Sequence, residues 1–223
     1  MSHSEAFKAP DSNTLIFETP NLFKPTPDID PSIAYHNEIG ARYAHPIWGS
    51  IRAAFFEIQT KKEILFNDIT NKNENFDTER YGVELGWEIA PIKDVNVFGN
   101  FAWTRAEFDN GAYDAKKIPL VPEIKWAAGV SWQFWNPFTL TVEGAGVARQ
   151  YALNDFTNRF RMEDYATAGA KLGWKKKNVE AWLRVDNVFG EEYSSFASSD
   201  GLTVLNLNPS PEQVIEAGVK TSF

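Results

Sequence analysis

The chain has 223 residues and is acidic, with 22 lysine and arginine residues against 30 aspartate and glutamate residues. Its net charge of -8 argues against a nucleic-acid partner, because phosphate binding requires a basic surface. The chain contains no cysteine, which excludes disulfide bonds, thiolate zinc sites and cysteine nucleophiles.

The hydropathy pattern predicts neither a signal peptide nor a transmembrane helix. The N-terminal sequence MSHSEAFKAPDSN has no apolar run of sufficient length for a signal peptide. The longest stretch without charge, Trp126–Val142, is interrupted at Asn136–Pro137 and by polar residues, which predicts a hairpin of two short strands. Aromatic residues make up 14% of the chain, which suits strands with one apolar face.

Apolar and polar residues alternate along most of the chain, as expected for strands that expose different chemistry on their two faces. Helical spacing fits these segments less well. In Tyr81–Ala90, for example, the odd positions are apolar, and the even positions from Gly82 to Glu88 are glycine or glutamate. The same alternation occurs in Glu38–Ala44, Val95–Trp103, Lys125–Phe134, Phe138–Arg149, Ala166–Trp174, Val179–Asn187 and Ile215–Phe223.

Short and long connections between these segments also alternate. The short ones are His45–Gly49, Pro91–Asp94, Trp135–Phe138 and Lys175–Asn178. The long ones are Pro10–Ser32, Lys61–Glu79, Asp109–Pro122, Leu153–Glu163 and Phe189–Glu212. This rhythm predicts an up-and-down sheet with tight turns at one rim and long loops at the other, which is the asymmetry of outer-membrane barrels.

One face of the predicted strands carries charged residues and many glycines. A sealed protein core excludes unpaired charges, whereas a wide lumen filled by water or protein accepts them. We therefore expect the following residues to face a lumen: Glu38, Arg42, Glu84, Glu88, Lys125, Glu143, Arg149, Lys171, Glu180, Arg184 and Lys220. Each is equally well explained as a solvated wall charge.

The other face is apolar, and many of its segments carry a terminal Trp, Tyr or Phe. Aromatic side chains concentrate at the interfaces between lipid and water. The prediction is therefore an all-β fold, an antiparallel up-and-down transmembrane β-barrel with a lipid-facing apolar stripe. The alternative is a soluble lectin-like β-sandwich, in which the same aromatic residues would pack in a core.

Several blocks, taken in order, resemble the C-terminal part of a TonB-dependent outer-membrane receptor. They are SEAFKAP (Ser4–Pro10), NLFKPTPDIDPSIAYHNEIGARY (Asn21–Tyr43), IRAAFFEIQTKKEI (Ile51–Ile64), TERYGVELGWEI (Thr78–Ile89), IPLVPEIKWAAGVSW (Ile118–Trp132), LRVDNVFGEEY (Leu183–Tyr193) and PSPEQVIEAGVKTSF (Pro209–Phe223). The blocks occur in the family's order along essentially the whole chain.

The resemblance implies that residues 1–223 form about the last ten strands of a barrel of about 22 strands, without a plug domain or signal peptide. In the family, a terminal aromatic residue and the alternating apolar residues before it are recognised by the barrel assembly machinery. Ile215, Ala217, Val219 and Phe223 occupy these positions, and Thr221 is the weak member. An isolated chain of this kind would have two unpaired strand edges, which favour association.

The resemblance also implies a function in the bacterial outer membrane, surrounded by its lipid. The full-length protein would import a scarce ligand, most often a ferric siderophore or another iron complex, with energy from the TonB complex acting through the missing plug. The lumen residues would contact the plug or the ligand. Ligand contacts are more plausible at loop tips, and the candidates are Tyr113, Tyr151, Phe156 and Arg159.

The residues themselves predict no enzyme. His3, His36 and His45 lie near no serine or carboxylate arrangement typical of catalysis, and no Gly-x-Ser-x-Gly motif occurs. We expect no catalytic residues, no cofactor and no metal site. The alternative function is a small self-contained outer-membrane barrel of about ten strands that acts as a passive channel, adhesin or hydrolase.

Overall fold

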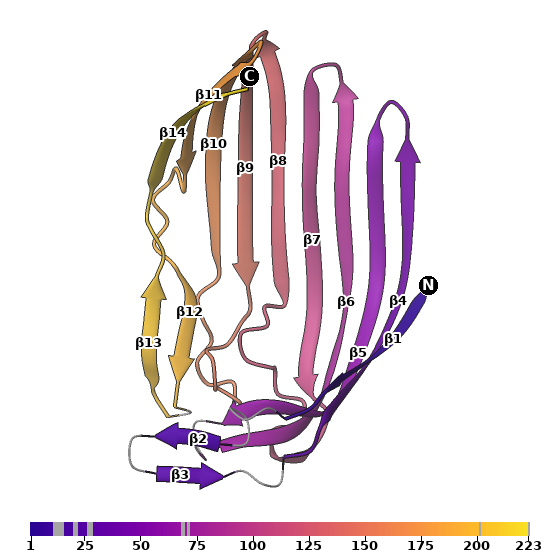
Figure 1. Cartoon of the computed structure of the whole chain (residues 1–223), viewed down its shortest axis with the longest axis vertical. Coiled ribbons are helices and arrows are strands. Elements are labelled where there is room, and N and C mark those ends of the chain that lie inside the picture. Colours follow the sequence, from indigo (N-terminus) through magenta and orange to yellow (C-terminus); the bar gives the residue numbers. More distant parts are fainter. Residues whose placement is uncertain are drawn as a thin grey trace.

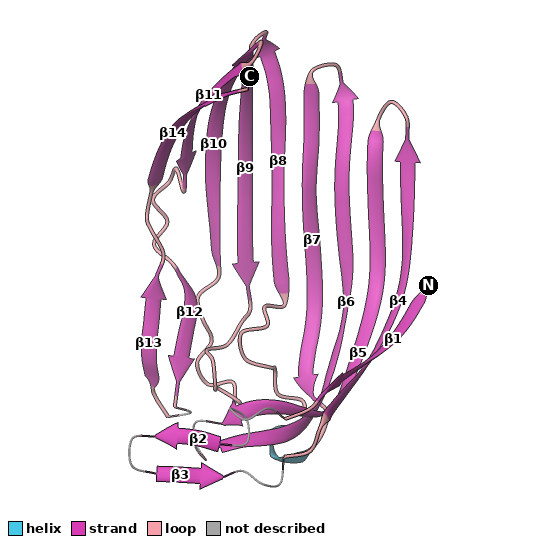
Figure 2. Ribbon diagram, viewed as in Figure 1, coloured by secondary structure: helices cyan, strands magenta, loops and turns pink. Residues whose placement is uncertain are grey.

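The computed structural model describes residues 1–10, 16–19, 22–25, 29–67, 70, 72–200 and 202–222. Its main feature is one antiparallel sheet of ten strands in the order β1-β4-β5-β6-β7-β8-β9-β10-β11-β14 (Figures 1 and 2). These strands are β1 (Ser2–Lys8), β4 (Ser32–His45), β5 (Gly49–Asn67), β6 (Lys72–Ile92), β7 (Val95–Phe108), β8 (Ile124–Trp135), β9 (Phe138–Ala148), β10 (Tyr165–Lys176), β11 (Val179–Asp186) and β14 (Val214–Thr221). The up-and-down topology expected from the sequence is confirmed.

Two small hairpins lie outside this sheet, within two of the long connections. They are β2 (Ile16–Thr19) with β3 (Leu22–Pro25), and β12 (Ser194–Ser199) with β13 (Val204–Pro209). A single 3-10 turn, η1 (Gly111–Tyr113), lies in the β7–β8 loop. Among the described residues, β1 and β14 are the edges of the large sheet and do not pair with each other. The sheet is therefore an open wall.

The two ends of the sheet differ in the length of their connections. Figure 1 shows the tight turns between β4 and β5, β6 and β7, β8 and β9, and β10 and β11 at one end, and the long loops with both hairpins at the other. At the first turn, Gly49 has a φ of 101°, and a Cβ atom there would lie 2.1 Å from the carbonyl oxygen of Glu88. Only glycine fits this turn without strain.

One predicted loop is wrong. The segment Lys61–Glu79 was expected to be a long polar connection, but β5 continues to Asn67 and β6 begins at Lys72. A β-bulge at Lys62, with a φ of 56°, shifts the register so that both strands continue beyond it. Past the bulge, Leu65 and Phe76 pack against a buried cluster, which stabilises this extension of the hairpin.

The register separates two chemically different faces. One row across five strands is entirely apolar: Ile39, Phe55, Val83, Trp103 and Ile124. The neighbouring row on the opposite face, one residue earlier or later on each strand, contains Glu38, Phe56, Gly82 and Thr104. We call the first face the outer face and the second the inner face.

The outer face leaves large apolar side chains uncovered. Ile39 is 59% exposed, Val142 is 50% exposed and Leu183 is 48% exposed. A continuous surface of this kind on a ten-stranded wall requires an apolar surrounding. No helix in the described part of the chain is long and apolar enough to cross a membrane.

The buried apolar residues gather near the long loops. One cluster contains Ala106, Phe108, Ile118 and Phe156, and a smaller one contains Ala152, Met162 and Ala197. Phe76 and Phe108 extend from the inner face, so the β7–β8 and β9–β10 loops pack onto that face. The core of this molecule is therefore a loop core at one end of a sheet.

Candidate functional site

The inner face gathers most of the charged residues that the alternation assigned to a lumen. By strand register they share this face on seven strands: Glu38, Arg42, Glu84, Glu88, Lys125, Glu143, Lys171, Glu180, Arg184 and Lys220. Arg149 follows the last residue of β9 with a φ of 60° and lies outside the alternation. What these side chains contact in the assembled protein stays a prediction.

On the inner face, two ion pairs of Arg184 on β11 reach Glu143 on β9, across β10, and Asp186 on β11. The Nη2 atom of Arg184 lies 2.9 Å from Oε1 of Glu143, and its Nε atom lies 2.7 Å from Oδ1 of Asp186. A cavity of about 390 Å³ adjoins this group, and Ala127, Ala145 and Gly169 are among the residues that line it. Because these residues are small, they leave space beside the Arg184 guanidinium for a ligand or a side chain of another protein segment.

The inner face carries a second ion pair nearer the loops, between Arg80 and Glu63. Nη1 and Nη2 of Arg80 each lie 2.9 Å from one carboxylate oxygen of Glu63, in a bidentate arrangement. The hydroxyl of Thr78 also donates to Glu63 at 2.5 Å. Sequence reasoning missed this group because Glu63 and Thr78 lay in a segment predicted to be a loop.

Four aromatic rings join the strands to two of the long loops. Phe76 of β6, Phe108 of β7, Tyr113 of the β7–β8 loop and Phe156 of the β9–β10 loop have ring centroids 5.2 to 6.0 Å apart. Most of these contacts are edge-to-face, which is the favoured geometry of aromatic pairs. Phe108 is 1% exposed and Phe156 is 3% exposed. The cluster fixes both loops over the inner face.

Polar contacts hold the β9–β10 loop in a defined shape. The buried carboxylate of Asp155 accepts hydrogen bonds from the amides of Arg159 at 3.0 Å and Phe160 at 2.7 Å. The side chain of Asn158 bonds both backbone groups of Lys117, at 2.6 and 2.9 Å. The two loops are thereby joined, and Arg159 follows directly from this fixed turn.

A cavity of about 590 Å³ lies between the β9–β10 loop and the β12–β13 hairpin. Its lining combines Arg159 and Arg161 with two carboxylates, of Glu163 and Glu192, and with aromatic and aliphatic residues that include Phe160, Tyr193 and Leu207. The Nη2 atom of Arg161 lies 2.7 Å from Oδ2 of Asp164. The hairpin is attached to the loop by backbone hydrogen bonds, from the Leu153 amide to Ala197 at 2.8 Å and from the Ser199 amide to Leu153 at 2.9 Å. The volume is within the range of small-molecule sites.

The four loop residues predicted to contact a ligand occupy different surroundings. Tyr113 and Phe156 belong to the aromatic cluster, where Phe156 is almost fully buried. Tyr151 is half-buried and pairs with Arg161 in an isolated β-bridge. Only Arg159 is both exposed and part of the cavity lining.

Sequence reasoning did not single out the other residues of this cavity. The signal that could have found Phe160 and Arg161 is the alternation of basic and apolar residues in Arg159–Met162. No local pattern indicates that Tyr193 and Leu207 lie opposite, because the hairpin reaches them from a distant part of the chain.

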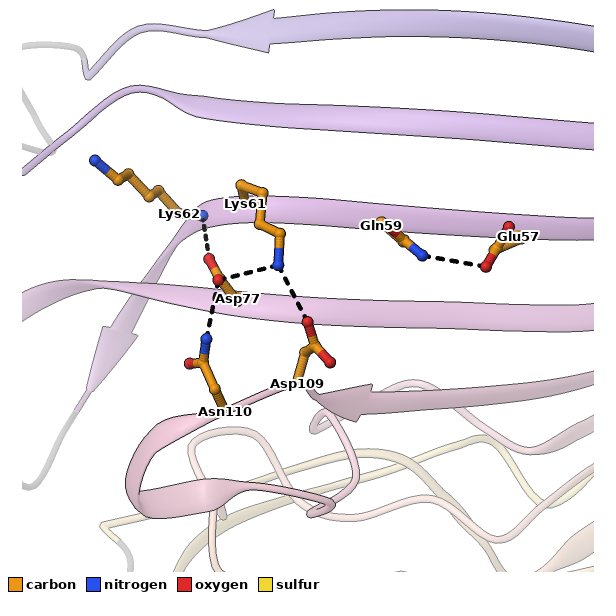
Figure 3. A network of polar contacts seen from close by, with 7 residues as sticks. All are labelled: Glu57, Gln59, Lys61, Lys62, Asp77, Asp109 and Asn110. Atoms are coloured by element: carbon orange, nitrogen blue, oxygen red, sulfur yellow. Dashed lines mark hydrogen bonds and ion pairs between the residues drawn. The ribbon is translucent and has the colours of Figure 1, made fainter.

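The outer face also becomes charged toward the long loops. Beyond the row of Tyr81, Lys61 of β5 has its Nζ atom 3.2 Å from a carboxylate oxygen of Asp77 and 3.2 Å from one of Asp109. The Asp77 carboxylate also accepts hydrogen bonds from the Lys62 amide and the Asn110 side chain, both at 2.9 Å (Figure 3). This network marks the end of the apolar stripe.

The charges of this network support one another. Hydrogen bonds to Asp109 and Asp77 raise the pKa of Lys61 above its ordinary value. Partial burial favours a higher pKa for Asp77, but the Lys62 amide and the Lys61 ammonium together outweigh it, so the pKa of Asp77 is lowered. Both groups therefore stay charged over a wide pH range.

The predicted assembly signal lies on the last strand of the sheet. Ile215, Ala217 and Val219 are on the outer face of β14, in register with Val185, Leu183 and Ala181, whereas Phe223 lies outside the described residues.

Within the described part of the chain, no group of three or more His, Cys, Asp or Glu side chains could hold a metal ion.

Comparison with known proteins identifies this architecture. The family model of the TonB dependent receptor-like β-barrel matches residues 1–188. The ferric yersiniabactin uptake receptor FyuA from Yersinia pestis is 21% identical, with a TM-score of 0.81 over 99% of this chain and 34% of that one.

Two other solved structures have the same fold. The ferric-catecholate import receptor Fiu from E. coli K12 is 19% identical, with a TM-score of 0.77 over 99% of this chain and 32% of that one. The copper transporter OprC is 16% identical, with a TM-score of 0.79 over 99% of this chain and 36% of that one. The chain thus spans about a third of the length of each of these proteins, and at these identities the likeness concerns the fold.

Proposed function

The chain belongs to the TonB-dependent receptor-like β-barrel family. From this premise we propose that it is the C-terminal wall of a receptor that imports a metal chelate of the ferric siderophore class. Proteins of this family reside in the outer membrane of Gram-negative bacteria, and the family comprises transport and receptor barrels rather than enzymes. The apolar outer face agrees with that location, since it is the surface that a lipid bilayer covers.

The observation that carries the proposal is the cavity of about 590 Å³ at the loop end. It combines two guanidinium groups, of Arg159 and Arg161, with the rings of Phe160 and Tyr193. Arg161 also pairs with Asp164, and Glu163 and Glu192 belong to the same lining, so Arg159 is the cation more open to a ligand. Siderophores present oxyanions around the metal together with apolar or aromatic backbones. Guanidinium groups bind oxyanions through charge-assisted hydrogen bonds, and aromatic rings contact the rest of the ligand. FyuA and Fiu are by name receptors for iron chelates, which supports this class, whereas OprC is a copper transporter.

The remaining predictions form part of the same proposal. In the complete protein, a plug domain would occupy the lumen and transmit energy from the TonB complex. The inner-face residues would contact that plug or the passing ligand. Tyr113, Tyr151 and Phe156 would act mainly by shaping the loops, and Arg159 by direct contact with the ligand. Ile215, Ala217, Val219 and Phe223 would form the signal for the assembly machinery.

A passive ten-stranded channel or adhesin is less well supported. Such a protein requires its first and last strands to pair, and in the described residues the edges β1 and β14 remain unpaired with each other. A hydrolase is not supported by any arrangement of the described side chains.

Uptake measurements test the proposal. Cells that lack the full-length gene are complemented with the wild-type gene or with R159Q/R161Q, and uptake of radioactive iron is measured with a panel of siderophores. We expect uptake of one chelate class to depend on the TonB complex, and R159Q/R161Q to raise the chelate concentration needed for half-maximal uptake by about tenfold or more. R105Q removes an outer-face cation, 46% exposed, that pairs with Glu107, and serves as the control. If the wild-type protein imports no iron chelate, the assignment of ligand class is wrong.

A further inference from the structure

Two arginines face each other on the inner wall near the tight turns. Arg42 of β4 and Arg52 of β5 are direct cross-strand partners, and both are exposed. Directly opposed residues of an antiparallel pair have Cβ atoms about 4.5–5.5 Å apart, and like charges at such positions are destabilising. Arg52 was not among the residues predicted to face a lumen, although it has the same orientation as Arg42.

Neither guanidinium has an ion-pair partner among the residues that the structure describes, since none of their carboxylates lies within 4.0 Å of Arg42 or Arg52. Glu84 and Glu88 lie on the same face, on either side of Gly86, the cross-strand partner of Arg52. Glu88 lines the same cavity as both arginines without forming an ion pair with either. The contrast with Arg184 on the same wall is clear, because that guanidinium is held by two carboxylates.

The wall beside the two arginines is shaped to hold them. The Arg52 side chain lies across Gly86, where an added Cβ would be 2.5 Å from Nε and 3.2 Å from Cζ of the arginine. A larger residue at position 86 would therefore displace the Arg52 side chain from this place. Both arginines line the same cavity of about 230 Å³, together with Ser50 and Glu88.

We propose that Arg42 and Arg52 form an oxyanion site that is completed by a carboxylate or a similar anion from outside the strands described. Paired guanidinium groups are suited to such an anion, because each offers several donors in one plane. Two sources share this chemistry: an acidic side chain of a protein segment inside the lumen, and an anionic solute that passes along the wall. The inference rests on the proposed function only in that it takes the inner face to line a lumen.

A cross-linking experiment detects the first source. The full-length protein carrying R42K or R52K, in outer-membrane vesicles, is treated with a carbodiimide, which joins a lysine amine to a carboxylate only when the two are in contact. Mass spectrometry then identifies the peptide linked to position 42 or 52. A link to an acidic residue outside residues 1–223 supports the proposal. Links only to acidic residues of this chain, such as Glu84 or Glu88, overturn it, because the wall would then neutralise its own charge.

Thermal unfolding detects the second source. The full-length protein in detergent is heated in citrate or phosphate and in chloride of equal ionic strength. For the wild type we expect the polyvalent anions to raise Tm by roughly 2–4 °C, and R42Q/R52Q to abolish the difference. The control K93Q/K176Q removes two exposed cations at the same end of the sheet and should retain the difference.

The cross-linking and thermal-unfolding measurements together test whether Arg42 and Arg52 form an oxyanion site. If no cross-link forms and the anions act equally on the wild type and R42Q/R52Q, there is no oxyanion site. Should R42Q/R52Q fail to fold, the lysine variants keep both charges and still give the cross-linking result. Iron uptake is not a readout of either arm, so a failed siderophore assignment leaves the result for this site unchanged, and the reverse also holds.

Discussion

The two faces of the ten-stranded sheet are built from the same strands but obey different rules. On the outer face, side chains such as Val130 and Val142 meet across neighbouring strands and stay exposed, so their surroundings must be apolar. On the inner face, the next residues along the same strands are Ser131 and Glu143. Because side chains alternate between the two faces of a strand, a residue suited to lipid is followed directly by one suited to a lumen.

The inner face is itself divided along the strand direction. Near the tight turns it is open, and there Arg42 and Arg52 form no ion pair with any residue in the described part of the chain. Near the long loops it is covered and contains buried aromatic rings such as Phe108. The inner face is therefore a solvent-accessible surface near the tight turns and part of a buried protein core near the long loops. Substitutions at the two faces and at the two ends test this division.

The largest effect is expected for Phe108→Ala. The ring is 1% exposed and contacts Phe76, Tyr113 and Phe156, so its removal leaves a cavity that costs about 3–5 kcal/mol. Because the cluster joins loops to strands, we expect the loss to appear as faster proteolysis and hydrogen exchange in both loops. The matched control is Phe55→Ala on the outer face, where the ring is 47% exposed. Equal protection of the loops in the two variants would contradict the idea of a loop core.

The next effect separates the two faces most directly. Val130→Arg places a charge in the apolar stripe and should cost roughly 2–4 kcal/mol in the unfolding free energy measured in lipid or detergent. Ser131→Arg places the same charge one residue further, on the inner face, where we expect the cost to be about 1 kcal/mol or less. Similar losses for both variants would mean that the faces do not differ in their surroundings.

Sequence alone predicted the wall well, because its two faces repeat a simple rule on every strand. The alternation of Val83, Leu85 and Trp87 with Glu84 and Glu88 is visible without any knowledge of neighbouring strands. The up-and-down topology followed from the regular exchange of short turns and long loops. Arg52 could have been found by the same rule, since it alternates with Ile51 and Ala53.

The loop end was harder to predict because its contacts are not periodic. The extension of β5 and β6 beyond Lys62 depends on a bulge that reverses which residues face inward. Phe156 is chemically similar to a ligand-contacting aromatic residue, and only its contact with Phe108 reveals that it is buried. The cavity beside Arg159 requires the β12–β13 hairpin, which lies about forty residues further along the chain.

A smaller effect is expected for the ion pair between Arg184 and Glu143. Both side chains are 40% exposed, so solvent screens the interaction and its coupling energy should be about 0.2–1 kcal/mol. A double-mutant cycle with Arg184→Gln and Glu143→Gln in the folded barrel measures this energy. We expect it to decrease with added salt. A coupling above about 2 kcal/mol would mean that this part of the wall is shielded from water, unlike the open wall proposed here.

The smallest effect concerns the outer face beyond the apolar stripe. The pKa of Asp77 is below its ordinary value of 3.8, so this carboxylate stabilises the fold above that pH and the contribution is lost as the pH falls through the folded-state pKa. The pKa of Lys61 is above 10.5, so its contribution is present below that pH and is lost as the pH rises through the folded-state pKa. Asp77→Asn should therefore lower Tm at neutral pH by an amount equivalent to about 0.2–1 kcal/mol.

The pH profile is the decisive measurement for this variant. The difference in Tm between the wild type and Asp77→Asn should be constant at neutral pH and vanish in strong acid, where the wild-type carboxylate is protonated. Asp114→Asn, an exposed change of equal charge in the β7–β8 loop, is the control. Since Lys61, Asp77 and Asp109 lie on the same face as Val83, a clear profile would establish that this face is surrounded by water at the loop end. If the difference in Tm between the wild type and Asp77→Asn does not change with pH, the lipid-covered stripe would instead continue past the row of Tyr81.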